Sequence, residues 1–380
     1  MHIIISTEKL KTALSKVITL VERKSTHSSY YFNASQGLVL FNATKESLTI
    51  TAFDMEVSIE LIVDCEKIEK EGKFCANPKN LFFLIKELPG KEVNVSLGED
   101  NLVNITCTNI NYSLVITKGD NFHVPKHELM ETSFDLPTDT MAMILNKTIG
   151  SMCADDTKSF LNGVFLKQVD GRLRAVSTDG YYLTLIEIDM VREAFRSLMD
   201  GVTIPRRGVY EIKRLAESFP GNKMTITVDE SYIRASVNNC YFVTALLMAR
   251  EFPNYQVVIP KKTEFSFSVS RELFLNSIRR IRLLCSNKAN TLKLTISPNV
   301  LTILARSPSV GFAEERLDIN YADKELSIAV NVLHLMDVLS NYDDDQIIFE
   351  FNNEDTPVIV KSPSALNYFS IICPLKLEYF

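Results

Sequence analysis

The chain has 380 residues, 46% hydrophobic and 23% charged, which is typical of a soluble globular protein of two or three domains, and no apolar run approaches the roughly 18 residues of a membrane span. The formal net charge of −6 argues against a protein that grips nucleic acid over its whole surface, since phosphate affinity comes from clustered lysine and arginine, but it leaves room for a local basic lining. The N-terminus lacks a long apolar signal and the seven scattered cysteines include no Cys-x-x-Cys pair, so we expect a cytoplasmic protein with reduced thiols and neither a disulfide framework nor a zinc site.

One type of segment occurs three times: a short strand, a serine or threonine at a helix start, and then an amphipathic helix. The helices are expected to start at Thr7, Thr138 and Ser270, which are 131 and 132 residues apart. Each start combines capping-type residues with apolar side chains at helical spacing. One period of the repeat therefore predicts one domain.

A second helix follows in each copy, over segments that begin at Asn77, Pro205 and Asn331. A polar turn and a strand with alternating apolar residues come after it, at residues 93–97, 224–228 and 347–351. Further alternating runs lie between the two helices of each copy, for instance at residues 38–43, 163–167 and 292–296. The pattern predicts an α+β fold of three repeated domains, each with two helices packed on antiparallel sheet.

The segments that join the copies have related sequences, Asn-Phe-His-Val-Pro at 121–125 and Glu-Phe-Pro-Asn-Tyr-Gln-Val-Val-Ile-Pro at 251–260. Proline there suits an extended connector that cannot continue a helix. The expected domains are 1–128, 129–259 and 260–380. They could be strung in a line, but open sheet edges invite aggregation, and domains joined edge to edge bury every edge only in a closed ring.

Four segments of this triplicated chain carry a resemblance to a known family. They are Ser-Thr-Asp-Gly-Tyr-Tyr-Leu at 177–183, Ile-Pro-Arg-Arg-Gly at 204–208, Phe-Pro-Asn-Tyr at 252–255 and Ile-Ile-Cys-Pro-Leu-Lys-Leu at 371–377. With these at matching places, the whole chain resembles the bacterial sliding clamps, the beta subunits of DNA polymerase III. The resemblance implies a non-catalytic, head-to-tail homodimeric ring of six similar domains, with helices lining the pore. Such a ring encircles duplex DNA without reading its sequence and tethers the replicative polymerase and repair proteins.

The resemblance also implies that the first domain of one chain meets the third domain of the other. The apolar residues at the matching positions are Tyr112, Leu114, Leu283 and Leu284. Glu314 and Glu315 match the acidic side of the family interface, while Thr108 and Asn109 stand where basic groups often occur. We therefore expect an interface held mainly by apolar contacts, although the two leucines could instead be ordinary core at a helix end.

For DNA contact, the resemblance points to Lys24, Lys79, Lys158, Phe160, Arg206 and Arg207. Basic groups on inward helices would attract phosphates without reading bases, as a mobile ring requires. Each lysine could equally belong to a solvated helix face. Asp155 and Ser159 stand where the family often has uncharged polar or aromatic DNA contacts, so this patch is expected to differ here.

The resemblance further implies a groove between the second and third domains, into which partner proteins insert a short peptide with a glutamine and apolar anchors. The matching residues are Leu161, Thr178, Gly180, Tyr181, Leu183, Pro253, Val257, Val258, Ile371, Cys373, Pro374 and Leu375. Small and apolar residues suit a peptide groove, although any one of them could be ordinary core. Tyr181, Tyr182, Cys373 and Leu375 depart from the family pattern and residues 378–380 extend past its usual ending, so an altered peptide preference is expected.

No pattern in the sequence predicts a catalytic site. Ser6 and Lys9 match Ser-x-x-Lys, but their place at a helix start favours capping. His123 and His127 have metal-ligand spacing interrupted by a proline, and Asp343–Asp345 read as a solvated turn. With no phosphate-binding loop or dinucleotide fingerprint, we expect no cofactor or metal, and ring opening by a separate loader ATPase. Two alternatives remain: a monomeric three-domain scaffold that binds proteins but no DNA, and a nuclease or hydrolase, which would need a carboxylate or histidine cluster.

Overall fold

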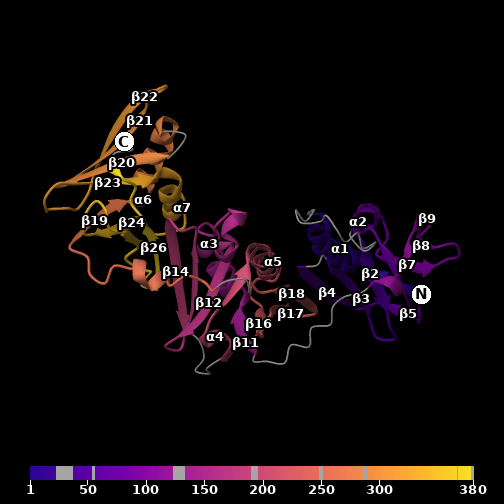
Figure 1. Ribbon diagram of the computed structural model, residues 1–380. Coiled ribbons are helices and arrows are strands. Elements are labelled where there is room, and N and C mark those ends of the chain that lie inside the picture. Colours follow the sequence, from indigo (N-terminus) through magenta and orange to yellow (C-terminus); the bar gives the residue numbers. More distant parts are fainter. Residues whose placement is uncertain are drawn as a thin grey trace. The chain divides into compact units, whose positions relative to one another are not determined.

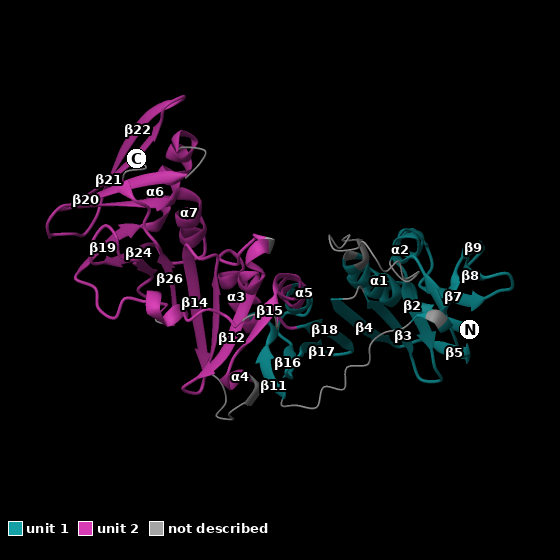
Figure 2. Ribbon diagram, viewed as in Figure 1, with its two compact units in different colours: residues 1–139, 214–245 teal, residues 140–213, 246–380 magenta. Residues whose placement is uncertain are grey.

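A computed structural model describes residues 1–22, 37–53, 56–122, 133–189, 196–247, 251–285, 290–365 and 367–377. The strands of these residues form four antiparallel sheets, and the chain divides into two compact units (Figures 1 and 2). Unit 1 comprises residues 1–139 and 214–245, and unit 2 comprises residues 140–213 and 246–380.

Unit 1 contains a five-stranded sheet and a nine-stranded sheet. The first has the order β5 (Lys67–Lys70), β1 (His2–Ser6), β7 (Glu92–Leu97), β8 (Leu102–Cys107) and β9 (Ile110–Val115). The second has the order β10 (Thr117–Lys118), β6 (Gly72–Ala76), β2 (Val39–Ala43), β3 (Leu48–Phe53), β4 (Val57–Val63), β18 (Cys240–Ala245), β17 (Tyr232–Val237), β16 (Lys223–Val228) and β11 (Ser133–Pro137). The helical segments are α1 (Thr7–Glu22), α2 (Pro78–Lys86) and the short η1 (Gly119–Asn121).

Unit 2 contains an eight-stranded sheet and a four-stranded sheet. The first has the order β15 (Val202–Pro205), β12 (Gly163–Val169), β13 (Arg172–Thr178), β14 (Tyr182–Asp189), β26 (Tyr368–Ile372), β25 (Val358–Lys361), β24 (Gln346–Phe351) and β19 (Phe265–Ser270). The second has the order β22 (Gly311–Asp318), β21 (Val300–Ser307), β20 (Thr291–Ser297) and β23 (Leu326–Asn331). The helical segments, including the larger parts of α3 and α5, are α3 (Thr138–Ile149), η2 (Asp156–Leu161), α4 (Arg196–Met199), α5 (Arg206–Glu217), η3 (Tyr255–Val258), α6 (Arg271–Ile281), η4 (Arg282–Leu284) and α7 (Val332–Ser340).

The repeat expected from the sequence is present as a repeated backbone contact. The first amide of each leading helix donates to a carbonyl in the turn that follows the second helix of the same copy. The three bonds join Thr7 N to Lys91 O (2.9 Å), Thr138 N to Asn222 O (2.9 Å) and Arg271 N to Asp345 O (2.8 Å). The third helix starts at Arg271 with Ser270 at its N-cap position. The same contact thus recurs in all three copies, and their helices and antiparallel sheets confirm the predicted α+β fold class.

Local capping explains where the second helices begin. The Asn77 side chain accepts from the amides of Lys79 (3.0 Å) and Asn80 (3.3 Å). Asn331 caps α7 in the same manner, accepting from Leu333 N (2.8 Å) and His334 N (3.3 Å). Asparagine at this position satisfies amides that have no partner within the helix.

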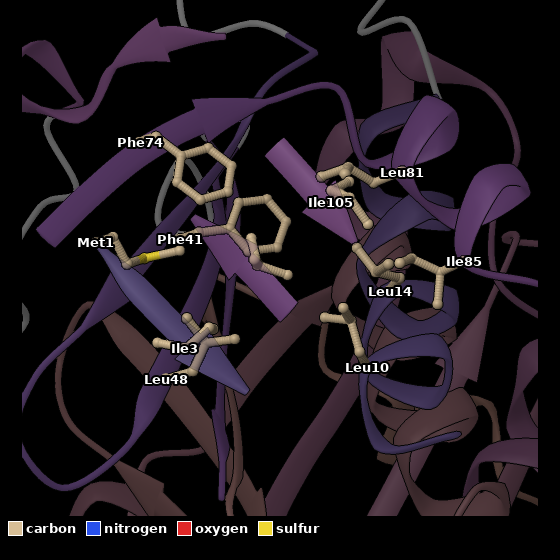
Figure 3. Close-up of a pocket in the computed structure, with 11 residues that line it drawn as sticks. Met1, Ile3, Leu10, Leu14, Phe41, Leu48, Phe74, Leu81, Ile85 and Ile105 are labelled. Carbon is tan, nitrogen blue, oxygen red and sulfur yellow. The ribbon is translucent and has the colours of Figure 1, made fainter. Parts of the chain in front are cut away.

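The core of the first copy is apolar and contains a cavity between its helices and sheets. Figure 3 shows Leu10 and Leu14 of α1, and Leu81 and Ile85 of α2, around this cavity together with residues of the sheets. Its lining side chains carry no charged group, so the cavity belongs to the packing of the core rather than to a reactive site.

Two strand pairs continue one copy's sheet into that of another. β4 pairs with β18, with Ile59 opposite Phe242, and β14 pairs with β26, with Leu183 opposite Ile371. In the described part of the chain, eight strands end one of the four sheets, and β9 and β22 are two of them. Edge strands with free backbone groups are ready to pair with another chain.

Candidate functional site

The seam between β14 and β26 contains two of the predicted peptide residues, Leu183 and Ile371, which are paired with each other. Beyond the strand ends, Cys373 N donates to Tyr181 O at 2.9 Å, so the pairing runs on into the turn that precedes β14. Under this seam lies a hydrophobic cluster of Phe165, Val176, Leu183, Leu185, Tyr255 and Ile371. Phe252 stacks on Phe165 with a 4.8 Å centroid distance and fixes the chain that leads into η3.

The predicted peptide residues differ in burial. Four of them are buried: Leu161, Thr178, Leu183 and Ile371. The others are exposed or half-buried and together are called the candidate peptide surface: Gly180, Tyr181, Pro253, Val257, Val258, Cys373, Pro374 and Leu375. Tyr181 is 55% exposed and Val257 76% exposed, so both side chains are accessible.

Hydrogen bonds of its own side chains build the turn that carries Tyr181. Asp179 Oδ1 accepts from the amides of Tyr181 (2.8 Å) and Tyr182 (3.0 Å). Thr178 Oγ1 accepts from Gly180 N (3.0 Å) and donates to Tyr182 O (2.7 Å). Gly180 has φ +94°, a conformation that side chains other than hydrogen rarely adopt. The Thr-Asp-Gly-Tyr-Tyr segment is therefore a specific turn rather than a flexible link.

Helix α7 supplies two residues that the sequence did not indicate. His334 Nε2 lies 3.2 Å from Asp179 Oδ2, and its ring stacks on Tyr182 with a 4.3 Å centroid distance. The Tyr182 hydroxyl donates to Asp337 Oδ2 (3.1 Å) and to the carbonyl of Gly150. His334 and Asp337 follow the helix cap Asn331 closely in the sequence. Their partners Asp179 and Tyr182 lie more than 150 positions earlier in the chain, so no local pattern indicates these contacts.

Burial and hydrogen bonding set the charges of this cluster. Burial raises the pKa of Asp337, and burial together with the neighbouring carboxylates of Asp337 and Asp179 raises the pKa of Tyr182. Although burial opposes it, hydrogen bonds from His334 and from the amides of Tyr182 and Tyr181 lower the pKa of Asp179. Asp179 thus stays ionised as the anchor of the turn, and Tyr182 stays a neutral hydrogen-bond donor.

The residues predicted to contact DNA differ in their exposure and in their contacts. Lys79 is exposed in the first turn of α2, and Lys24 lies outside the described residues. Arg206, at the start of α5, donates to Cys153 O at 3.3 Å, and Arg207 and Phe160 are half-buried. Lys158 Nζ lies 5.2 Å from the centre of the Tyr181 ring, beside the candidate peptide surface.

The predicted dimer residues lie on or next to strands that end a sheet. Tyr112 (46% exposed) and Leu114 belong to β9, while Leu283 (78% exposed) and Leu284 form η4, which contacts β22. An ordinary core role is therefore wrong for Leu283, and Leu284 is only half-buried.

The acidic residues of β22 already have cationic partners in their own chain. Arg280 Nη2 lies 2.6 Å from Glu315, and Arg316 Nη2 lies 2.8 Å from Glu314. A hydrogen bond from Arg280 lowers the pKa of Glu315. These carboxylates need no basic partner from another chain.

The residues considered for catalysis have structural roles. Ser6 Oγ accepts from Lys9 N at 3.5 Å, a capping contact, while His123 and His127 lie outside the described residues. In the acidic turn, Asp343 pairs with Lys147 (3.2 Å) and Asp344 accepts from Ser364 (2.6 Å). Within the described ranges, no group of three or more His, Cys, Asp or Glu side chains could hold a metal ion.

The cysteines are free thiols, and burial raises the pKa of Cys65, Cys75, Cys240 and Cys285 to about 11. Such thiols are poor nucleophiles at neutral pH. None of the helices in the described ranges combines the length and the apolar character needed to cross a membrane.

Comparison with known proteins gives consistent matches along the chain. Models of the DNA polymerase III beta subunit match here: its N-terminal domain at residues 1–125, its central domain at 135–254 and its C-terminal domain at 256–376. The beta sliding clamp of Caulobacter vibrioides (strain NA1000 / CB15N) is 25% identical over 383 residues, covering 99% of this chain and 100% of the relative. That of Escherichia coli (strain K12) is 25% identical over 342 residues, covering 90% and 92%.

Solved structures share the fold over nearly the full length. The crystal structure of the DNA polymerase III subunit beta from Pseudomonas aeruginosa has a TM-score of 0.92 at 24% identity, covering 99% of this chain and 100% of that one. A DnaN sliding clamp from the same organism, solved bound to griselimycin, has a TM-score of 0.91 at 24% identity, with the same coverage.

Proposed function

This chain belongs to the DNA polymerase III beta subunit family, and from that premise we propose that it works as a ring that encircles duplex DNA and tethers the replicative polymerase. It is a processivity factor, a sliding clamp. The observation that carries this function is the tandem match of all three family domains, in order, on a chain whose copies join sheet to sheet. A monomeric scaffold without DNA binding is not favoured.

Ring closure by a second copy follows from the free edges. The pairs β4–β18 and β14–β26 join the three copies of one chain, and β9 of the first copy and β22 of the third copy are among the strands that end a sheet in its described part. If β9 of one chain meets β22 of another, and the reverse, both edges are buried and assembly stops at two chains. Tyr112, Leu114, Leu283 and Leu284 would then bury apolar surface at each of two equivalent joints.

The positively charged residues contact DNA weakly and without sequence preference in this proposal. Lys24, Lys79, Arg206 and Arg207 are the candidates, and Phe160 would contribute an aromatic contact. Because the net charge of the chain is −6, retention depends on the closed ring rather than on tight equilibrium binding. Lys158 is the candidate whose position beside Tyr181 fits peptide contact better than DNA contact.

The candidate peptide surface binds short segments of partner proteins: the polymerase, the clamp loader and repair proteins. Burying two apolar anchors gives a gross gain of roughly 3 to 6 kcal/mol before ordering costs, which by itself corresponds to dissociation constants of roughly millimolar to tens of micromolar. Partners of this affinity can exchange on one ring.

We further propose that the ring has no catalytic activity, acts in the cytoplasm and is opened by a loader ATPase. The proposed domains are residues 1–128, 129–259 and 260–380.

A primer-extension experiment tests the function. On a singly primed circular template, the replicative polymerase should synthesise longer products per binding event when this protein, the clamp loader and ATP are all present. Omitting ATP is the control, since the ring should then stay off the template. Product lengths that do not change when the protein is added would count against a processivity role.

A further inference from the structure

Resting on the proposed peptide-binding function, we propose that His334 of α7 is a positioning residue that holds the 179–182 turn and thereby presents the Tyr181 ring to a bound peptide. Tyr181 is the aromatic residue of the candidate peptide surface, and its side chain is 55% exposed. Its backbone joins both walls of that surface, since Tyr181 O accepts from Cys373 N at 2.9 Å. What fixes this turn therefore also fixes the spacing between Tyr181 and the segment 373–375.

His334 contacts the 179–182 turn in two ways. Nε2 lies 3.2 Å from Asp179 Oδ2, while the other carboxylate oxygen of Asp179 accepts the amides of Tyr181 and Tyr182. The imidazole ring also stacks on Tyr182 and lies 6.5 Å from the Tyr181 ring centre at an interplanar angle of 27°. One residue of α7 thus holds both the carboxylate that shapes the turn and the rings that follow it.

The hydrogen bond between His334 and Asp179 is largely shielded from water. The side chains of His334 and Asp179 are 19% and 20% exposed, so water competes only weakly for their hydrogen bond. The Tyr182 hydroxyl in turn has Asp337 and the Gly150 carbonyl as hydrogen-bond partners. Of the two tyrosines, only Tyr181 projects outward, and a ring that is already ordered loses little entropy when a peptide packs on it.

Two substitutions separate the hydrogen bond from ring packing. His334→Phe keeps an aromatic ring for stacking but removes the donor to Asp179. His334→Gln keeps an N–H donor of similar reach but removes the ring. If the hydrogen bond positions the turn, His334→Phe should weaken peptide binding about fivefold, and His334→Gln should stay within about twofold of the original protein.

Calorimetry on the full-length protein, with a short synthetic peptide that carries one glutamine and two leucine anchors, measures these dissociation constants. The same measurements in a Tyr181→Ala background complete a double-mutant cycle. Because His334 acts through Tyr181, His334→Phe should have no further effect once the Tyr181 ring is gone. Equal weakening in both backgrounds would show general loosening and overturn the proposal, as would unchanged affinity of His334→Phe.

Melting temperature and sedimentation mass of each variant serve as folding controls. Should the phenylalanine destabilise α7, His334→Leu offers a smaller side chain without a donor, and the same fivefold loss is expected. Original protein that fails to bind the peptide would refute the candidate peptide surface and this inference together. Binding by the original protein with no loss in the variants refutes the inference alone.

Discussion

Replacing Leu283 and Leu284 together by alanine is expected to turn the dimer into monomers. Leu283 is 78% exposed in the single chain, and it lies in η4 beside β22, a strand that ends its sheet. Burying a leucine stabilises by roughly 1.5 to 3 kcal/mol, and the pair occurs at both joints of a closed ring. Losing two such side chains at each joint removes a large part of the apolar contact.

Sedimentation velocity measures the outcome directly. The original protein should have a mass of about 86 kDa, twice the chain mass of 43.0 kDa, and the double variant should sediment as a single chain. Leu273→Ala is the matched control, because Leu273 is 59% exposed on the preceding helix α6 but is not at the proposed joint. A double variant that remains dimeric at low micromolar concentration would show that the joint lies elsewhere.

The same joint should respond little to salt. Glu314 and Glu315 are already paired with Arg316 and Arg280 of their own chain, so screening removes no ionic contact between chains. High salt strengthens rather than weakens apolar burial. Dissociation of the dimer on raising the salt concentration would contradict an apolar interface.

Deleting residues 374–380 is expected to abolish peptide binding while leaving the dimer intact. Leu375 N donates to Ala329 O at 2.7 Å, an isolated bridge that ties the end of the chain to β23. Pro374 and Leu375 are half-buried members of the candidate peptide surface, so the deletion removes one of its walls. The dimer should survive, because β22 and η4 are separate parts of the third copy.

The shorter deletion of residues 378–380, which lie outside the described residues, is the control for this prediction. It should leave peptide affinity unchanged or raise it, if the added aromatic tail competes with an incoming peptide. Calorimetry with a polymerase-derived peptide compares the three proteins. Undiminished binding after the longer deletion would refute the surface, and loss of binding after the shorter one would refute the competing tail.

Local features of the fold were predictable because they depend on neighbouring residues. Thr7 and Thr138 mark helix starts, and the caps Asn77 and Asn331 sit where the sequence places second helices. The period of two in the strands follows from one buried and one exposed face. Ser270 is the small exception, since the strand β19 continues through it and the helix starts one residue later.

Long-range features were not predictable from the residues alone. No local signal states that Leu183 pairs with Ile371, or that Arg280 neutralises Glu315. The face of α7 that meets the 179–182 turn depends on how the copies pack. The contacts of His334 and Asp337 with this turn were therefore not predictable. The proximity of Lys158 Nζ to the Tyr181 ring, 5.2 Å from its centre, likewise has no local signal, and the DNA role of Lys158 stays a prediction.

Retention on DNA of different topology tests the central claim most directly. Protein loaded onto a nicked circular plasmid should co-elute with it through gel filtration at physiological salt, and cutting the plasmid once should release the protein, because a ring slides off a free end. Persistent binding to the linear duplex under the same conditions would contradict encirclement and would point to ordinary electrostatic binding instead.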